Sequence, residues 1–149
     1  MKFYVNAMAR SLREISSKLL DHTDVIVEHI IKLVLMPDHT ARNHWKKEIA
    51  MQINSIDTLK GSNKLPSAEQ IYKWTYKEIE NHVNDKKWMS EAIDEIEYDY
   101  NISIEMTSEE VCNAVDKVCS EYFGWLADYL SQSGRIAAYK IYNKLDELV

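Results

Sequence analysis

A chain of 149 residues with only three glycines and two prolines has little of the turn chemistry that β-hairpins need, so its length and composition favour one domain of long helices. Its hydrophobic content of 46% beside 28% charged residues is ordinary for a folded protein and excludes a disordered chain. The formal net charge of −6 comes from the second half of the chain and disfavours nucleic acid as a ligand there.

The longest apolar stretch, residues 25–36, is interrupted by Glu28 and Lys32 and reaches only about half of the roughly 20 residues that a membrane span requires. No uninterrupted apolar segment of a secretory signal precedes Arg10. We therefore predict a cytoplasmic protein that does not cross a membrane.

Apolar residues recur at steps of three and four through the first segment, which predicts a helix over residues 3–36 with one buried face. This face consists of Val5, Met8, Leu12, Ile15, Leu19, either Val25 or Ile26, Ile30 and Leu33. The polar run of residues 21–24 is a candidate break that would divide the helix into two. Pro37 ends the segment, because the residue before a proline is disfavoured in the helical conformation, and Asp38 is then placed to cap the next helix.

A second helix is predicted from the same spacing, and Gly61 is placed to end it. Its buried stripe comprises Trp45, Ile49, either Gln52 or Ile53, Ile56 and Leu59. Ser67 and Gln70 follow Pro66 with the spacing of a capping box, which predicts the start of a third helix. The inner face of that helix comprises Ile71, Trp74 or Thr75, Glu78 or Ile79, and His82.

A fourth helix is predicted from about Lys87. Its buried face comprises Trp88, Ile93, Ile96 and Tyr100. Residues 101–106 alternate polar and apolar side chains, but the run is too short and isolated to be more than an extended connector. Thr107 and Glu110 then repeat the capping-box spacing and start a fifth helix.

Apolar positions continue the fifth helix to Tyr129, Gly134 is placed to close it, and residues 135–148 are predicted as a last helix. No internal repeat or low-complexity tract divides the chain. The sequence therefore predicts an all-α fold, a single-domain bundle of five or six helices that spans residues 1–149.

Charge is unevenly distributed along the sequence. Residues 1–75 carry 11 Lys and Arg against 8 acids, a balance of +3, whereas residues 76–149 carry 7 against 16, a balance of −9. Residues 78–110 alone hold 11 acids, opposed only by Lys86 and Lys87. Such a region attracts a basic partner and repels phosphate backbones, so the second half favours a protein ligand over nucleic acid.

Two interpretations of this acidic run remain open. It can be a solvated helix face that keeps the protein in solution, or it can be a docking surface for a protein with a basic surface. For a docking surface, the predicted contact residues are Glu91, Asp94, Glu95, Tyr98, Asp99, Glu105 and Glu109. The i, i+4 spacing within this set lets the fourth helix present acids and an aromatic ring along one side.

The histidines do not have the spacing of a metal site in a helical bundle. The sequence contains no Glu-x-x-His pair, which would place two ligands on one helix face, and the nearest histidines, His39 and His44, are five residues apart. The best metal candidates form a local cluster of Asp21, His22, Asp24 and His29. The alternative is a polar surface segment that breaks the helix.

Other candidate chemistry is sparse. Glu78 and His82 lie i, i+4 and are placed to share a proton, but this spacing is also common in structural pairs. Cys112 and Cys119 lie roughly 10 Å apart on one predicted helix, beyond disulfide distance, and are predicted to be core thiols. The isolated glycines form no phosphate-binding loop. We therefore expect a protein that is not an enzyme and that carries neither a cofactor nor a metal.

A stretch of about 30 residues resembles a known family. It comprises His29, Lys32, Pro37, Trp45, Ile49, Gln52, Ile56 and Leu59. In this order and spacing, these residues resemble the central signature of the helical bacterial family catalogued as domain of unknown function twenty-nine. The resemblance implies an all-helical domain and no catalytic residue. The family's arginine-rich face after the Trp is replaced here by Lys46, Lys47 and Glu48, and its N-terminal aromatic motif is missing. By their own chemistry, Trp45 and Gln52 are placed to lock two helices together through packing and one buried hydrogen bond.

These observations predict a small acidic binding protein, an inhibitor, antitoxin or immunity-type partner that occupies a basic site on another protein. The competing class is a structural homo-oligomer, in the simplest case a homodimer, whose oppositely charged halves meet between subunits and are sealed by aromatics such as Tyr129 and Tyr139. A third class, a metal-dependent enzyme built on the cluster between Asp21 and His29, would require bound metal.

Overall fold

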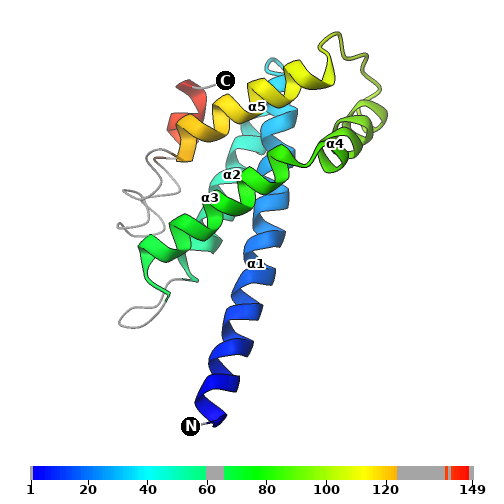
Figure 1. Cartoon of the computed structure of the whole chain (residues 1–149). Helices are drawn as coiled ribbons and strands as arrows, with labels where there is room; N and C mark the ends of the chain where they lie inside the picture. Colours follow the sequence, from blue (N-terminus) through cyan, green and yellow to red (C-terminus); the bar gives the residue numbers. More distant parts are fainter. Residues whose placement is uncertain (1, 60–65, 124–139, 141, 148–149) are drawn as a thin grey trace.

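The fold is an all-α bundle, as predicted. The computed structural model describes the backbone of residues 2–59, 66–123, 140 and 142–147, and the side chains of residues 12–59, 66–121, 140 and 142–147. The elements are α1 (Lys2–Leu35), α2 (Arg42–Asp57), α3 (Ala68–Asn84), α4 (Lys86–Asp99), α5 (Ser108–Phe123) and a C-terminal helical segment at residues 142–147. Over these ranges no strand is formed, and α1 is the long element against which the others are arranged (Figure 1).

Helix α1 runs without interruption through the polar run that was a candidate break. Thr23 is fully buried, and its hydroxyl donates hydrogen bonds to the carbonyl oxygens of Leu19 (2.8 Å) and Leu20 (3.0 Å). The hydroxyl is therefore satisfied by the helix itself, and the polar residues cause no break. The predicted end before Pro37 is confirmed, because the helix stops at Leu35.

The predicted cap of α2 is wrong. Asp38 lies too early in a short turn, and the N-cap position is occupied by Ala41, which makes no side-chain capping bond. The ring of His39 takes part of this role, because its Nδ1 accepts a hydrogen bond from the Ala41 backbone N–H (2.9 Å). Helix α2 ends at Asp57, and Gly61 lies outside the described residues.

The capping box of α3 is confirmed. The Ser67 hydroxyl accepts from the Gln70 N–H (3.2 Å), while the Gln70 side chain accepts from the Ser67 N–H (2.9 Å). At α5, Thr107 likewise accepts from the Glu110 N–H (3.2 Å), although the Glu110 carboxylate accepts from the Thr107 hydroxyl instead of a backbone N–H. Helix α4 is capped by Asp85, whose carboxylate accepts from the Trp88 N–H (3.1 Å).

The Ser67 cap gives a prediction about stability. Replacing Ser67 with alanine leaves the Gln70 N–H without its partner, and we expect this to lower the free energy of unfolding by about 1 kcal/mol. Urea denaturation followed by circular dichroism measures the change. Ser67→Asp serves as the control, since aspartate can also cap and should retain most of the stability.

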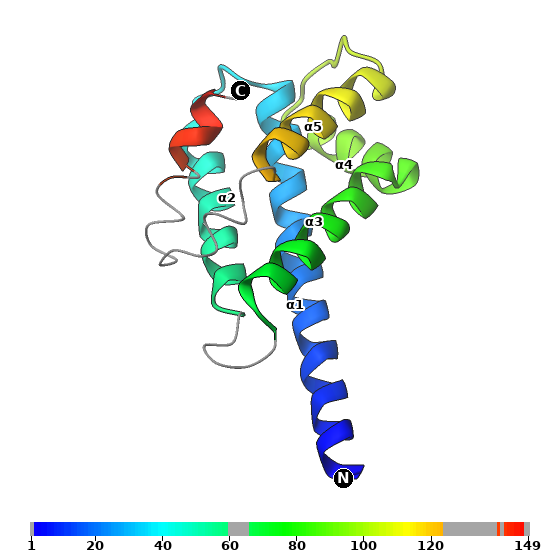
Figure 2. The same ribbon diagram turned by 60° about the vertical axis from the view of Figure 1, so that its left-hand side comes forward.

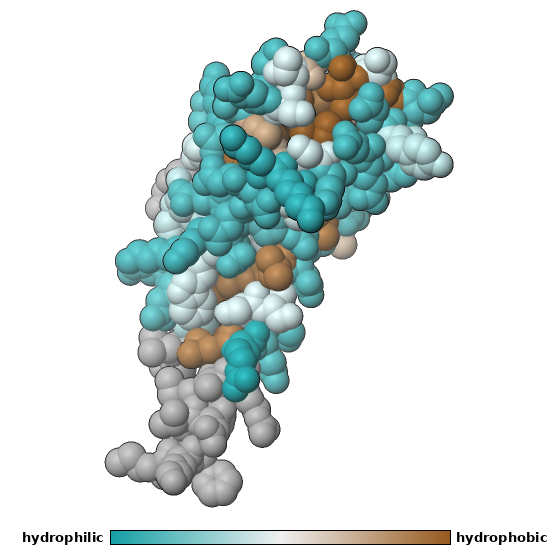
Figure 3. Space-filling model, turned by 45° about the vertical axis from the view of Figure 1, so that its right-hand side comes forward, coloured by the Kyte–Doolittle hydropathy of each residue, from teal (hydrophilic) through white to brown (hydrophobic). Residues whose placement is uncertain are grey.

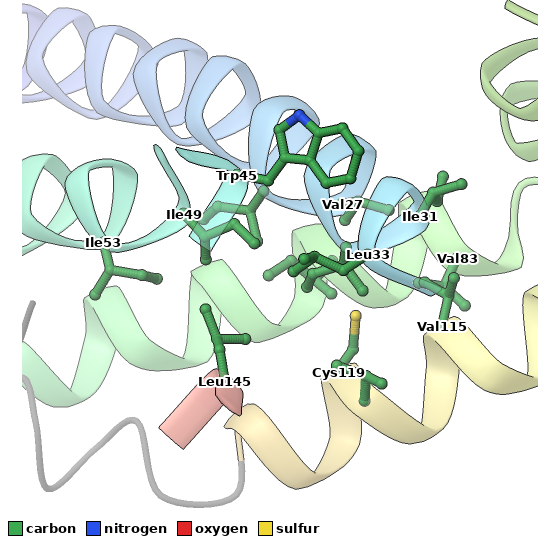
Figure 4. Packing of buried hydrophobic residues seen from close by; sticks show 14 of the residues in the cluster. Val27, Ile31, Leu33, Trp45, Ile49, Ile53, Val83, Val115, Cys119 and Leu145 are labelled. Carbon is green, nitrogen blue, oxygen red and sulfur yellow. The ribbon is translucent and has the colours of Figure 1, made fainter. Parts of the chain in front are cut away.

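The core is formed where α2, α3 and α5 meet the second half of α1. Its fully buried side chains include Ile26, Ile30, Leu33, Ile49, Ile53, Ile56, Ile71, Met89, Val111 and Val115. Figure 4 shows Ile49 and Leu145 pointing into this interior from opposite sides, with Leu33 and Cys119 between α1 and α5. Ile102, Ile104 and Met106 of the extended connector pack against the same core and form no strand, as predicted.

The C-terminal helical segment docks on α2 through a buried charge. Lys46 is 1% exposed, and its ammonium group donates to the carboxylate of Asp146 and lies 4.4 Å from the ring centroid of Tyr142. Arg42 donates to the same carboxylate at 3.0 Å, and Leu145 beside it is fully buried. The last predicted helix is therefore present in its described part, whereas the predicted continuation to Tyr129, the closing Gly134 and Tyr139 lie outside the described residues.

Candidate functional site

The predicted contact residues fall into two groups. Helix α4 carries Glu91, Asp94, Glu95, Tyr98 and Asp99, all of them exposed, and the Tyr98 ring is 86% exposed. The other two lie elsewhere, with Glu105 in the connector after α4 and Glu109 in the first turn of α5. The seven residues therefore come from three separate elements of the chain.

Two adjacent hollows lie where α4 meets α1 and the end of α3. One, of about 300 Å³, is lined by Leu20, Asp24, Glu78, Asn81, His82, Asp85 and Trp88. The other, of about 180 Å³, is lined by Asp24, Glu28, Trp88, Glu91, Ala92 and Glu95. Because they share Asp24 and Trp88, we treat them as one feature, the acidic groove.

The acidic groove collects carboxylates from three helices and a helix junction. Its six acids are Asp24 and Glu28 of α1, Glu78 of α3, Asp85 between α3 and α4, and Glu91 and Glu95 of α4. In the described part of the chain, no lysine or arginine lines either hollow. Figure 3 turns the α4 side toward the viewer and shows a mostly hydrophilic surface, with a larger apolar area near its upper end.

Trp88 forms the shared wall of the two hollows. It lies in the first turn of α4, is partly exposed, and packs edge-on against the ring of His82, with the ring centroids 4.7 Å apart. Asp85 fixes this turn by capping the Trp88 N–H. An aromatic face held rigidly among carboxylates can receive the aliphatic stem or the cationic head of a lysine or arginine.

His82 joins α3 to α1 beneath the groove. It is 6% exposed, its Nδ1 donates to the carbonyl oxygen of Glu78 (2.6 Å), and its Nε2 meets the carboxylate of Asp24. These two contacts fix α1 against α3. Of the two interpretations of Glu78 and His82, the shared proton is not formed, since His82 contacts the Glu78 backbone carbonyl and not its carboxylate, and the structural alternative holds.

The remaining carboxylates keep the groove negative. Glu28 forms an ion pair with Lys32 at 3.5 Å, but its side chain is 44% exposed, so this pair neutralises it weakly. Among the described residues, Glu91 and Glu95 have no ion-pair partner. Glu91 and Glu95 follow Trp88 by three and seven residues on α4, so they lie on the same side of the helix as its ring. Two negative charges at this position favour a positively charged ligand.

The cluster from Asp21 to His29 is dispersed and does not form one site. His22 bonds through Nδ1 to the Gln52 side chain (2.6 Å), Asp24 is held by His82, and His29 donates to the Val25 carbonyl oxygen (2.7 Å). Burial lowers the pKa of His29. Among the residues that the structure describes, no three His, Cys, Asp or Glu side chains are arranged to hold a metal ion.

The two thiols are separate, as predicted. Cys119 is buried in the core and Cys112 is partly buried, and neither forms a disulfide. Burial raises the pKa of both thiols, far above its ordinary range for Cys119. A thiol in this state is a poor nucleophile, so both residues have a packing role.

Residues of the signature stretch have structural roles. Trp45 is 2% exposed and stacks on His39 with ring centroids 5.0 Å apart, while Tyr100 meets Trp45 edge-on at 5.7 Å. Lys32 lies 5.6 Å from the Tyr100 ring centroid. The hydrogen bond from His22 Nδ1 to the Gln52 side-chain oxygen joins α1 to α2, so the predicted lock between two helices is confirmed.

The sequence indicated only part of the groove. Glu91 and Glu95 were found from the charge run, whereas Asp24 and Glu28 were missed as members of this site and Trp88 was assigned to a buried face. The one available signal was the i, i+4 spacing of Asp24 and Glu28 on the side of α1 away from its apolar stripe. That spacing does not reveal that α4 will lie beside them.

Comparison with family models, with curated proteins and with solved structures finds no match for this chain. The resemblance to the helical family therefore stays a prediction. Within the described ranges, no helix combines the length and the apolar character that crossing a membrane demands.

Proposed function

We propose that this protein is a small acidic binding protein that docks onto a basic site of another protein, in the manner of an inhibitor, antitoxin or immunity protein. The observation that supports this most is the acidic groove, in which six carboxylates surround the partly exposed ring of Trp88. Carboxylates and an aromatic face are the two groups that best bind a lysine or arginine side chain.

In this proposal the groove and the exposed surface of α4 contribute different parts of the contact with the partner. A basic side chain of the partner enters beside Trp88 and is held by Glu91 and Glu95, while Asp94 and Tyr98 on the exposed surface of α4 extend the contact. Tyrosine and tryptophan are typical anchors of protein interfaces, and surrounding carboxylates increase the rate of encounter.

A matched pair of variants tests this proposal. Glu91→Gln with Glu95→Gln removes two charges inside the groove, and Glu105→Gln with Glu109→Gln removes two charges outside it, so both variants have the same net charge. We expect the groove variant to bind a fluorescein-labelled peptide of nine arginines about tenfold more weakly at low salt, a change of about 1.4 kcal/mol. The other variant should change the affinity by less than about twofold.

Fluorescence polarisation measures both affinities, and circular dichroism checks that the variants fold. Equal losses in the two variants would show that the peptide senses only the overall charge, which contradicts a role for the groove. Pull-down from the host cells identifies the natural partner, which should be released at high salt and should not be recovered by the groove variant.

A further inference from the structure

The first half of α1 extends beyond the rest of the bundle. Figures 1 and 2 show this from two directions, with the N-terminal end far below the other labelled helices. We call residues 2–20 the arm; its last turns still contact the bundle, because Leu19 is 1% exposed and Ile15 packs against the core. Leu12 is 40% exposed and Leu20 is 45% exposed, so two large apolar side chains of the arm face solvent.

Leu12, Ser16 and Leu20 form one row along the arm. Residues four apart lie above one another on a helix and form a ridge that can pack against another helix. All three are exposed, and the small Ser16 between the two leucines permits close approach of a second helix backbone. The row leads directly into the acidic groove, since Leu20 also lines its larger hollow.

The charges along α1 are opposite in sign on its two halves. Within the arm, Lys2, Arg10, Arg13 and Lys18 stand against Glu14, a balance of +3. The next part of the helix, residues 21–35, carries Asp21, Asp24 and Glu28 against Lys32, a balance of −2, and the groove acids of α4 lie beside it. Two parallel copies of α1 would bring like charges together, whereas two antiparallel copies would bring opposite charges together.

We propose that a second copy of this chain covers the arm, with the two α1 helices antiparallel and a twofold axis near Ser16. In this register Leu12 of each copy meets Leu20 of the other, and Ser16 meets Ser16. The contact is isologous, because the same residues contribute from both sides, as a closed dimer requires. The half of each α1 whose sequence is basic then runs beside the half of the other copy's α1 whose sequence is acidic.

The mass of the chain in solution tests the dimer. Sedimentation velocity and light scattering measure the molecular mass of the full chain in solution. At about 1–100 µM, an ordinary range for homodimers, this mass should be about twice the chain mass of 17.5 kDa. Leu12→Glu places two carboxylates in the apolar contact and should convert the dimer to monomer, with at least a tenfold weaker association. Met51→Glu is the matched control, because Met51 is a large apolar residue of α2 that is 51% exposed and does not belong to the row of Leu12, Ser16 and Leu20, so its replacement should leave the dimer intact.

Cysteine cross-linking tests the orientation. In a Cys112→Ser background, Ser16→Cys lies near the twofold axis and should form a disulfide-linked dimer on oxidation, whereas Leu12→Cys should not. A parallel, in-register pair would cross-link at both positions. A monomeric wild-type chain, a dimer that persists in Leu12→Glu, or cross-linking at position 12 would each overturn the proposal. The dimer does not rest on the proposed function, since a monomer that still binds the arginine peptide would contradict only the dimer.

Discussion

Replacing Trp45 with alanine is expected to lower the free energy of unfolding by about 3–5 kcal/mol, the usual range for removing a fully buried aromatic side chain. Trp45 is 2% exposed and lies between His39, stacked at 5.0 Å, and Tyr100, edge-on at 5.7 Å. The truncation leaves a cavity at the start of α2 and removes both ring contacts, and the Tyr100 ring near Lys32 loses its support. Urea denaturation followed by circular dichroism measures the change.

A second tryptophan provides the comparison. Trp74 is only partly buried against the core, so Trp74→Ala should cost clearly less than Trp45→Ala. Trp45→Phe, which keeps an aromatic ring in the same place, should recover more than half of the loss. A loss below about 1 kcal/mol for Trp45→Ala would show that this ring is not part of a tightly packed core.

The second large effect is expected at the pair of Lys46 and Asp146. Asp146→Asn removes the charge that faces an ammonium group buried to 1% exposure, and we expect a loss of about 2 kcal/mol. This is less than the roughly 3–5 kcal/mol for a fully buried pair, because the Asp146 side chain is 45% exposed and Arg42 also contacts it. Lys46→Met in the Asp146→Asn background should recover most of the loss, since it removes the uncompensated charge.

The same pair sets a pH dependence. The hydrogen bond from Lys46, with its positive charge and that of Arg42, holds the pKa of Asp146 below its ordinary range. Because the pKa is lower in the folded state, the contribution to stability is fully present above the unfolded pKa of about 4 and is lost as the pH falls through the folded value. The difference in the free energy of unfolding between wild type and Asp146→Asn should thus be constant between pH 5 and 7, which lies above both the folded and the unfolded pKa of Asp146. It should shrink below about pH 4.

The nearby pair of a half-buried Lys144 and an exposed Glu147, 2.8 Å apart, is the control for this prediction. Glu147→Gln should change the free energy of unfolding by less than about 0.5 kcal/mol at neutral pH, because exposed ion pairs contribute little. A loss equal to that of Asp146→Asn would mean that the burial of Lys46 has no special importance.

The features that were predicted correctly depend on local chemistry. The capping box at Ser67 and Gln70 and the stop before Pro37 each need only a few neighbouring residues, and spacing of three and four residues marks the buried faces wherever a helix packs. Asp38 failed as a cap because its preference for that position does not determine how many residues the turn will contain.

The features that were missed depend on contacts between distant segments. Lys46 and Asp146 are separated by 100 residues, and Asp24 and His82 by 58, so no local pattern joins them. The acidic groove has the same origin, because its carboxylates belong to helices whose mutual placement is set by the core. From sequence, a lysine such as Lys46 is usually assigned to the surface. Its burial is possible only because a partner far along the chain supplies a negative charge.

The docking of the C-terminal segment also has a consequence for biosynthesis. Asp146 leaves the ribosome 100 residues after Lys46, so α2 is synthesised without the carboxylate that its buried ammonium group requires. Until then Lys46 stays hydrated, and the part of the core beside Leu145 stays open to water. The burial of Lys46 must therefore follow the synthesis of both segments, however early α2 itself forms.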